Sequence, residues 1–260
     1  MTTARLHPFE AIDNFRDFGG YPTVNGRQVR TGRLYRSAHH ARMTKADLKR
    51  LAGLGIGAVV DLRRPVERQR QPSLRPQGFE GLVIENDLDA QGEAPHITFL
   101  KTSDLTPDSG RRFMMDTYGR MPFAPTYHDL FRRYFETLGA SDGAVVVHCA
   151  AGKDRTGLLV ALTHHLLGVG HADMMADYML TNGAVDLERL APSFAKQIET
   201  MSGRKPSDDA VVAFMGVEPA YLEAAFAAID QRHGSVDAYL EQVIGVDDPL
   251  RLRIIERLTH

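Results

Sequence analysis

The sequence predicts an α/β fold with a largely parallel central sheet flanked by helices, followed by a helical C-terminal part. Two observations support this fold class. Up to Val147, short apolar runs rich in β-branched residues alternate with helical patterns, which is typical of strands joined by helices. After Thr156 the chain becomes mostly helical. The expected strands are residues 32–37, 56–62, 82–85 and 145–147.

Capping residues indicate where several helices begin. Thr44 is a suitable N-cap for a helix over residues 45–54, and Asp248-Pro249 supplies an N-cap followed by proline at the first helical position. Residues 156–167 have the apolar spacing of a helix with a buried face. Further helices are expected at residues 193–201, 208–215, 218–232, 236–243 and 249–258.

Composition limits the class of protein. The chain has 260 residues, 43% of them hydrophobic and 25% charged, and we expect a single domain over residues 1–260. The formal net charge of −2 gives no reason to expect nucleic acid as a partner. Cys149 is the only cysteine, so the chain has no disulfide framework and no cysteine-based zinc site. We expect no metal and no other cofactor.

Residues 148–157, with the sequence HCAAGKDRTG, carry the strongest chemical signal. They lie where the strand 145–147 meets the helix that follows. A loop at such a junction can turn backbone N–H groups inward, and the helix N-terminus adds partial positive charge, which together form a cradle for phosphate. The expected phosphate-binding residues are Ala150, Ala151, Gly152, Lys153, Asp154 and Arg155.

Cys149 and Arg155 have complementary roles in this cradle. A cysteine that faces a helix N-terminus and a guanidinium can be a thiolate at neutral pH. Cys149 could then attack phosphorus to form a cysteinyl-phosphate that water hydrolyses, while Arg155 holds two phosphate oxygens. Thr156 could stabilise the leaving thiolate in the second step. For His148 we favour a role in ordering the loop over direct catalysis.

Two other interpretations of the segment are weaker. A buried structural cysteine before a glycine turn would not require an arginine at this spacing. The nucleotide-binding loop GxxxxGK[ST] is excluded because it would need glycine in place of Val147 and serine or threonine in place of Asp154.

The segment resembles the CX5R signature loop of the cysteine-dependent protein-tyrosine and dual-specificity phosphatases. Its Lys153-Asp154 pair is similar to that of the bacterial subfamily typified by mycobacterial protein-tyrosine phosphatase B. That resemblance implies activity on phosphotyrosine that extends to phosphoserine, phosphothreonine and phosphoinositides. Further blocks that agree with it are NFRDFGG at residues 14–20, GRLYRSA at 32–38, VVDLR at 59–63 and ADYMLTN at 176–182.

Three aspartates could protonate the leaving group, which departs badly as an alkoxide. We rank Asp61 first, because it ends a strand expected to run parallel to the one before the loop and because the resemblance favours it. Arg63 adjoins Asp61 and could hold it in place. Asp154, inside the loop, ranks second as acid or base. Asp116 is expected to be a solvated helix residue.

Lys153 and two longer segments are weaker candidates. We expect Lys153 to bind ligand, since it resembles the lysine that phosphoinositide phosphatases use, with loop solubility as the alternative. The charged run 63–70 is expected to be a solvated face. Helices corresponding to residues 193–217 form a lid over the active site in the resembled family, although the sequence equally fits a helical pair packed on the core.

The favoured function is metal-free phosphomonoester hydrolysis on a phosphorylated protein or a phosphoinositide. The alternative is a non-catalytic phosphate-binding module on the same fold. An arsenate reductase is disfavoured because that chemistry recruits further cysteines. The N-terminus MTTARLHPFE lacks the apolar segment of a signal peptide, and no stretch approaches membrane-spanning length. We expect a cytoplasmic protein, although members of the resembled family can be exported without a cleavable signal.

Overall fold

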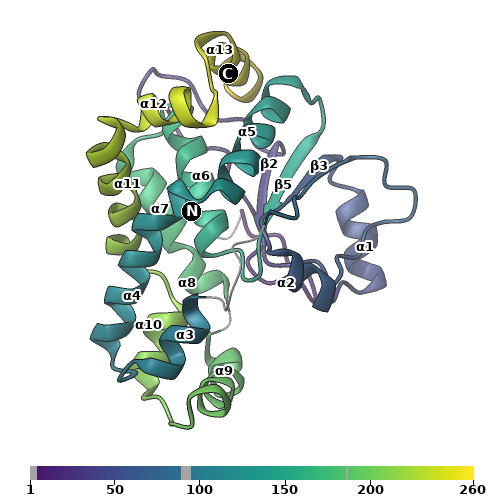
Figure 1. The fold of residues 1–260 in the computed structure, drawn as a ribbon. Helices are drawn as coiled ribbons and strands as arrows, with labels where there is room; N and C mark the ends of the chain where they lie inside the picture. Colours follow the sequence, from purple (N-terminus) through teal and green to yellow (C-terminus); the bar gives the residue numbers. More distant parts are fainter. Residues whose placement is uncertain (1–4, 89–94, 186) are drawn as a thin grey trace.

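The fold is built on a five-stranded sheet (Figure 1). The structure is a computed structural model and describes residues 5–88, 95–185 and 187–260. The strands are β1 (Arg16–Asp17), β2 (Leu34–Ser37), β3 (Ile56–Asp61), β4 (Leu82–Ile84) and β5 (Ala144–His148), in the order β1-β2-β5-β3-β4. Among the four strand pairs of this sheet in the described residues, β1–β2 is antiparallel and the other three are parallel. The predicted α/β fold with a largely parallel sheet is therefore confirmed.

Helices connect the strands and form most of the C-terminal half. Those up to residue 184 are α1 (Lys45–Ala52), α2 (Pro65–Arg70), α3 (Pro95–Thr102), α4 (Pro107–Arg120), α5 (Pro125–Ala140), α6 (Asp154–Leu166), α7 (His171–Met179) and α8 (Thr181–Ala184). A 3₁₀ turn, η1 (Met121–Phe123), joins α4 to α5. The rest are α9 (Leu187–Ser202), α10 (Asp208–Met215), α11 (Pro219–His233), α12 (Val236–Tyr239), the π-helical turn η2 (Leu240–Ile244) and α13 (Asp248–Leu258).

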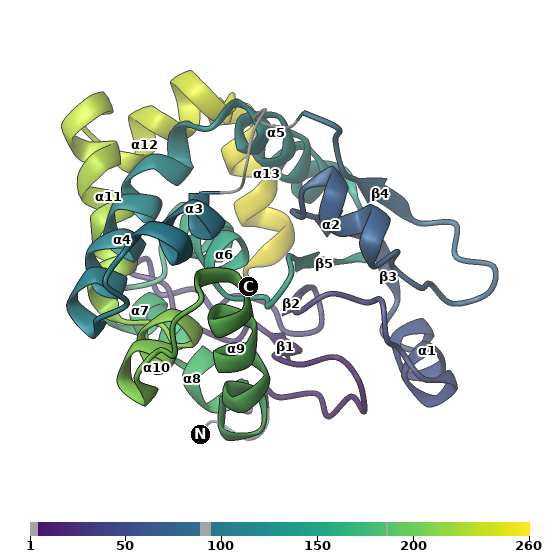
Figure 2. The same ribbon diagram turned by 60° about the horizontal axis from the view of Figure 1, so that its bottom comes forward.

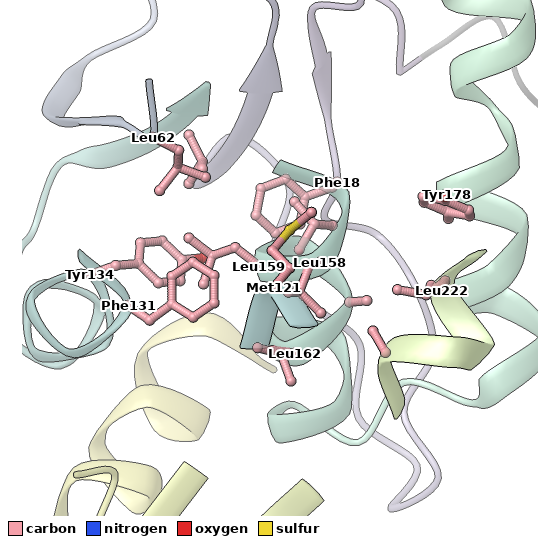
Figure 3. Packing of buried hydrophobic residues seen from close by; sticks show 14 of the residues in the cluster. Phe18, Leu62, Met121, Phe131, Tyr134, Leu158, Leu159, Leu162, Tyr178 and Leu222 are labelled. Atoms are coloured by element: carbon pink, nitrogen blue, oxygen red, sulfur yellow. The ribbon is translucent and has the colours of Figure 1, made fainter. Parts of the chain in front are cut away.

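The two faces of the sheet pack into separate apolar clusters because alternate strand residues point to opposite sides. Val147 of β5 faces the larger cluster, which contains α5 and α6. Figure 3 shows Leu159 of α6 beside Phe131 and Tyr134 of α5 in this cluster. Val146 faces the smaller cluster, where Leu51 of α1 lies. Cys149 belongs to the larger cluster, so its side chain points to the α6 side of the sheet.

The capping predictions succeed at one helix and are shifted by one residue at another. Thr44 is the N-cap of α1, and its hydroxyl accepts a hydrogen bond from the amide of Asp47 at 3.1 Å. At α13 the predicted N-cap was wrong. Asp247 caps that helix by accepting from the amide of Leu250 at 2.8 Å, while Asp248 is already helical. Asp247 and Asp248 are both suitable N-cap residues, and the sequence alone does not determine which of them caps the helix.

Helices α3, α9 and α10 lie together at one end of the molecule (Figures 1 and 2). Within the described residues, no single helix has the length and apolar character to cross a membrane. One bent pair, α10 with α11 at 47°, meets those criteria when the two helices are taken together.

Candidate active site

Cys149 lies at the predicted junction between strand and helix. It directly follows β5, residues 149–153 form a loop, and α6 begins at Asp154. The strand ends in the middle of the sheet, between β2 and β3, so the loop is surrounded by other elements. Cys149 is 2% exposed and is a free thiol.

Hydrogen bonds from outside the loop hold three of its carbonyl groups. The amide of His39 donates to the oxygen of Ala150 at 3.1 Å. The Asn14 amide nitrogen Nδ2 donates to the oxygen of Ala151 at 3.3 Å and to that of Gly152 at 2.8 Å. Arg36 Nη2 also donates to the oxygen of Gly152, at 3.0 Å.

This anchoring orients the loop amides. In a trans peptide the C=O and the following N–H point in opposite directions. Carbonyls 150–152 are bound on the outside, so the N–H groups of residues 151–153 turn to the inside. Within the part of the chain that the structure describes, no acceptor takes a hydrogen bond from these three N–H groups. They are therefore available to an anion, as the sequence predicts for a phosphate cradle.

Gly152 is required for this loop shape. Its φ is +64°, in the left-handed region that favours glycine. A Cβ built there would lie 2.3 Å from the backbone oxygen of Ser37, at the end of β2. Any side chain at this position would push the loop away from the sheet.

Arg155 is fixed by a glutamate that the sequence analysis did not identify. Its Nη1 and Nη2 donate to the two carboxylate oxygens of Glu67 at 2.6 and 2.9 Å, and Nη1 also donates to the oxygen of Leu62 at 3.1 Å. Burial raises the pKa of Glu67, but the bonds from Arg155 outweigh burial and lower it. The charged run 63–70 is thus a solvated face only in part: Val66, Gln69 and Arg70 are exposed, whereas Arg63 is 2% exposed and Glu67 faces the loop.

Tyr127 of α5 is a further residue at the site without a signal in the sequence. Burial raises the pKa of its phenol, and the charges of Arg155, Cys149 and Glu67 act on it as well. Its ring stacks on Phe131 with 5.9 Å between centroids. Tyr127 therefore lies close enough to Arg155 and Glu67 for their charges to act on its phenol.

Asp61 occupies a different side of the sheet from Cys149. It is the register partner of His148, with which it shares a face, and it is fully buried. Arg63 donates to both of its oxygens, at 2.9 and 2.7 Å. Burial opposes its charge, yet His148 and Arg63 hold the pKa of Asp61 well below its usual value.

The Asp61–Arg63 pair also lines a cavity of about 350 Å³, and Cys149 is not among the residues that line it. The predicted contact between Arg63 and Asp61 is thus present, but the carboxylate is fixed in its charged form and turned away from the thiol. The catalytic role of Asp61 stays a prediction, and this geometry does not favour it.

His148 is buried at the base of the loop. Its Nδ1 lies 3.4 Å from the oxygen of Cys149, Nε2 lies 3.6 Å from Asp61 Oδ2, and its ring stacks on His40 at 4.3 Å between centroids. Burial lowers the pKa of His148 to about 4, so the ring is neutral at pH 7. These contacts fit a role in ordering the loop.

The buried His148 predicts loss of stability in acid. An unfolded histidine has a pKa of about 6.5, so between pH 6.5 and 4 the unfolded chain binds more protons than the folded one. The free energy of unfolding should fall through this window, by up to about 3 kcal/mol from His148. Urea unfolding followed by circular dichroism from pH 7.5 to 4.5 measures the slope. We expect His148→Gln to reduce it and His171→Gln, at an exposed position, to leave it; equal slopes in all three proteins would contradict this account.

Lys153 is directed at α10. Its ammonium donates to the backbone oxygen of Phe214 and, at 3.1 Å, to that of Gly216, and the residue is 5% exposed. These carbonyls lie at the C-terminal end of α10, where a helix favours a cation. Lys153 thus ties the loop to the segment predicted as a lid, and its role as a phosphate ligand stays a prediction.

Asp154 and Thr156 lie in the first turn of α6. The Asp154 side chain is 29% exposed, and its Oδ1 accepts a hydrogen bond from the phenol of Tyr118 at 2.9 Å. Thr156 Oγ1 is buried and has no hydrogen-bond partner among the described residues, and its predicted role toward the sulfur of Cys149 stays a prediction. Asp116, by contrast, is exposed and pairs with Arg120 at 2.6 Å, as expected for a solvated helix residue.

A buried ion-pair network supports the loop from behind. Asp177 of α7 pairs with Arg36 at 2.8 Å and with Arg16 at 3.6 Å. Burial raises the pKa of Asp177, but the two arginines outweigh burial and lower it. Arg36 bonds the loop at Gly152, and Arg16 bonds Asn14, which holds the loop as well. Charged residues inside otherwise apolar stretches were the signal that could have identified this network.

Comparison with known proteins agrees with the geometry. A family model for tyrosine phosphatases matches residues 7–260. A protein of Cupriavidus necator named as a tyrosine-protein phosphatase is 35% identical over 92% of this chain and 84% of its own length. The triple specificity protein phosphatase PtpB of Mycobacterium tuberculosis is 32% identical over 87% of this chain and 90% of its own. A tyrosine-protein phosphatase of Nostoc commune is 27% identical, with coverages of 87% and 74%. The chain therefore belongs to the tyrosine phosphatase family and is a phosphatase.

Proposed function

We propose that the protein hydrolyses phosphomonoesters through a cysteinyl-phosphate formed on Cys149. The observation that carries the proposal is the loop itself. Its carbonyls 150–152 are bound outward, its amides 151–153 have no hydrogen-bond acceptor among the residues that the structure describes, and Arg155 is held at its edge by Glu67. Such a loop binds a phosphate dianion by its amides and by the α6 N-terminus without any metal.

The first step transfers the phosphoryl group to sulfur. The Cys149 thiolate attacks phosphorus, the bond from phosphorus to the ester oxygen breaks, and that oxygen takes a proton from the general acid. Water then attacks the cysteinyl-phosphate, gives its proton to the same carboxylate, and releases the thiolate. Arg155 and the loop amides offset the charge on the phosphoryl oxygens in both steps, and Thr156 can donate to the departing sulfur.

Asp154 is the better candidate for the general acid. It lies in the first turn of α6, directly after the loop that carries Cys149, and its side chain is partly exposed. Asp61 is fully buried, bound at both oxygens by Arg63, and held in the form that has no proton to give. The order of the two candidates is therefore the reverse of the one that the sequence favours.

The proposed substrates are phosphotyrosine, phosphoserine, phosphothreonine and phosphoinositides. The support is the similarity to a relative whose name gives it triple specificity. We also propose that α9 and α10 act as a lid, with Lys153 as the contact between loop and lid. A cytoplasmic location would suit the single thiol, which must stay reduced to react.

The test is phosphate release from phosphotyrosine, phosphoserine and phosphoinositide substrates by the wild type, Asp154→Asn and Asp61→Asn, with EDTA present. We expect Asp154→Asn to slow phosphoserine hydrolysis about 10²–10⁴-fold, the range of a lost general acid. Asp61→Asn should mainly lower the melting temperature, because it leaves Arg63 buried without its partner.

The opposite pattern, in which only Asp61→Asn loses phosphoserine hydrolysis while folding normally, would return the acid role to Asp61. No release from any substrate, with vanadate still bound, would instead support the phosphate-binding module.

A further inference from the structure

Two buried tyrosines connect distant helices to the first turn of α6. Tyr178 of α7 donates from its hydroxyl to the hydroxyl of Tyr118 of α4 at 2.7 Å, and Tyr118 donates to Asp154 Oδ1 at 2.9 Å. Tyr118 is fully buried and Tyr178 is 1% exposed. Burial raises the pKa of both phenols, so both keep their protons at neutral pH.

The direction of these bonds is determined by the number of protons. Tyr118 has one hydroxyl proton and lies between Asp154 and Tyr178. If its oxygen accepted from both neighbours, its own proton would be buried without an acceptor, which costs free energy. Tyr118 therefore donates to the carboxylate and accepts from Tyr178.

The packing around the pair fixes its position. A Cβ at Gly157 would lie 2.9 Å from the Tyr178 ring, so a glycine on α6 is what allows this ring to lie against the helix. The Tyr118 ring meets Tyr178 edge to face, with 6.3 Å between centroids, and lies 5.9 Å from the ring of Tyr221. The Tyr118 hydroxyl is thus held where it is by three helices.

Only one oxygen of Asp154 is engaged by these contacts. Tyr118 donates to Oδ1, and the ammonium of Lys153 lies 3.4 Å from the same atom. Among the described residues, none forms a hydrogen bond or ion pair with Oδ2. Since donors already face Oδ1, a proton on that oxygen would meet another donor, and the proton of the neutral acid belongs on Oδ2.

We infer that Tyr118, supported by Tyr178, is a positioning residue that holds Asp154 so that Oδ2 delivers the proton to the leaving group. This inference rests on the proposed function, in which Asp154 is the general acid. On this inference Tyr118 acts only through the carboxylate to which it donates. Removing its hydroxyl should therefore impair those substrates that need a proton on departure and spare those that do not.

The test compares kcat/KM for 4-nitrophenyl phosphate, phenyl phosphate and a phosphoserine peptide, since kcat/KM reports the steps up to the cysteinyl-phosphate. We expect Tyr118→Phe to reduce kcat/KM about 10-fold for phenyl phosphate and the phosphoserine peptide, the effect of one hydrogen bond to a charged group. For 4-nitrophenyl phosphate, whose leaving group departs as a stable anion, the loss should be under about 3-fold. Tyr178→Phe should also reduce kcat/KM more for phenyl phosphate than for 4-nitrophenyl phosphate, but by a smaller factor than Tyr118→Phe.

Tyr134→Phe is the matched control. Tyr134 is also fully buried and bonds Thr163 at 2.9 Å, on a part of α6 away from Asp154. We expect Tyr134→Phe to leave the relative kcat/KM values of the three substrates unchanged, even if the variant lowers the melting temperature.

The double variant Asp154→Asn/Tyr118→Phe makes the decisive comparison. If Tyr118 acts through Asp154, the double variant should be no slower than Asp154→Asn alone. The inference would be overturned if the double variant lost the product of the two single losses in kcat/KM. It would also be overturned if Tyr118→Phe lost kcat/KM equally on all three substrates. Hydrolysis by the wild type with an unchanged rate in Asp154→Asn would instead overturn the assignment of the acid, and no hydrolysis by the wild type would overturn the proposed function itself.

Discussion

Cys149→Ser is expected to lower phosphate release by more than about 10⁴-fold, the order of loss when an enzyme loses its covalent nucleophile. A serine hydroxyl at this position would keep its proton at neutral pH. His148, the nearest imidazole in sequence, is turned to the other face of the sheet, where it packs on His40. The measurement is initial phosphate release from a phosphotyrosine peptide with EDTA present.

A trapping experiment distinguishes loss of the nucleophile from loss of the site. Acid quenching of the wild type during turnover should leave one phosphoryl group on the peptide that contains Cys149, and none in Cys149→Ser. The serine variant keeps the loop amides and Arg155, so it should still bind vanadate and be stabilised by it. Turnover that survives the substitution would place the nucleophile elsewhere in the chain.

The parts of the site that follow one another in sequence could be predicted from it. A β-branched run, a cysteine, a glycine and a helical pattern occur in that order at residues 144–166, and the structure has the same order. Local geometry explains this success, because a strand, a tight loop and a helix N-terminus are each determined by residues within a few positions. The glycine at residue 152 is needed by the left-handed φ of the loop itself.

The residues that hold the loop in place are distant in sequence and were harder to assign. Glu67 precedes Arg155 by 88 positions, and Asp177 follows Arg36 by 141. Glu67 lies among arginines in a run that is typical of a solvated surface. Only the position of α2 beside the loop makes it the partner of Arg155.

Strand register explains the different outcome for Asp61. The prediction that its strand runs parallel to β5 is confirmed, and both strands end at the same edge of the sheet. Asp61 is level with His148, however, and neighbouring residues of a strand point to opposite faces. A shift of one residue would have turned the carboxylate toward Cys149. Sequence patterns do not determine register to one residue in a strand that is apolar on both faces.

The bounds of helices α4 and α5 were not predicted, although Asp116 was expected in a helix and α4 has a clear start. Thr106 caps it, with proline at the next position. The helix contains two glycines and three arginines in 14 residues, which weakens its apolar pattern. The face of α4 that carries Tyr118 and Met114 is buried because α10 and α11 pack against it, and this packing cannot be predicted from the local sequence.

Arg155→Lys should reduce kcat/KM by about 10³-fold, the order of loss on removing a preorganised charged donor from a transition state. A guanidinium can bond Glu67 through two nitrogens and keep other N–H donors for phosphate, whereas an ammonium is a single point charge on a flexible chain.

Glu67→Gln keeps the shape of the side chain and loses its charge. We expect a smaller loss in kcat/KM of about 10-fold, seen mainly as a higher KM, because the guanidinium of Arg155 is then less firmly held. Arg111→Lys is the control, since Arg111 pairs with Glu218 on the exposed surface, its Nε donating to the two carboxylate oxygens at 2.9 and 3.2 Å, and should leave kcat/KM unchanged. If Arg155→Lys retained kcat/KM within 10-fold, the free amides of residues 151–153 and the α6 N-terminus would have to bind the phosphate by themselves, and the Glu67–Arg155 pair would serve only to brace α2 against the loop.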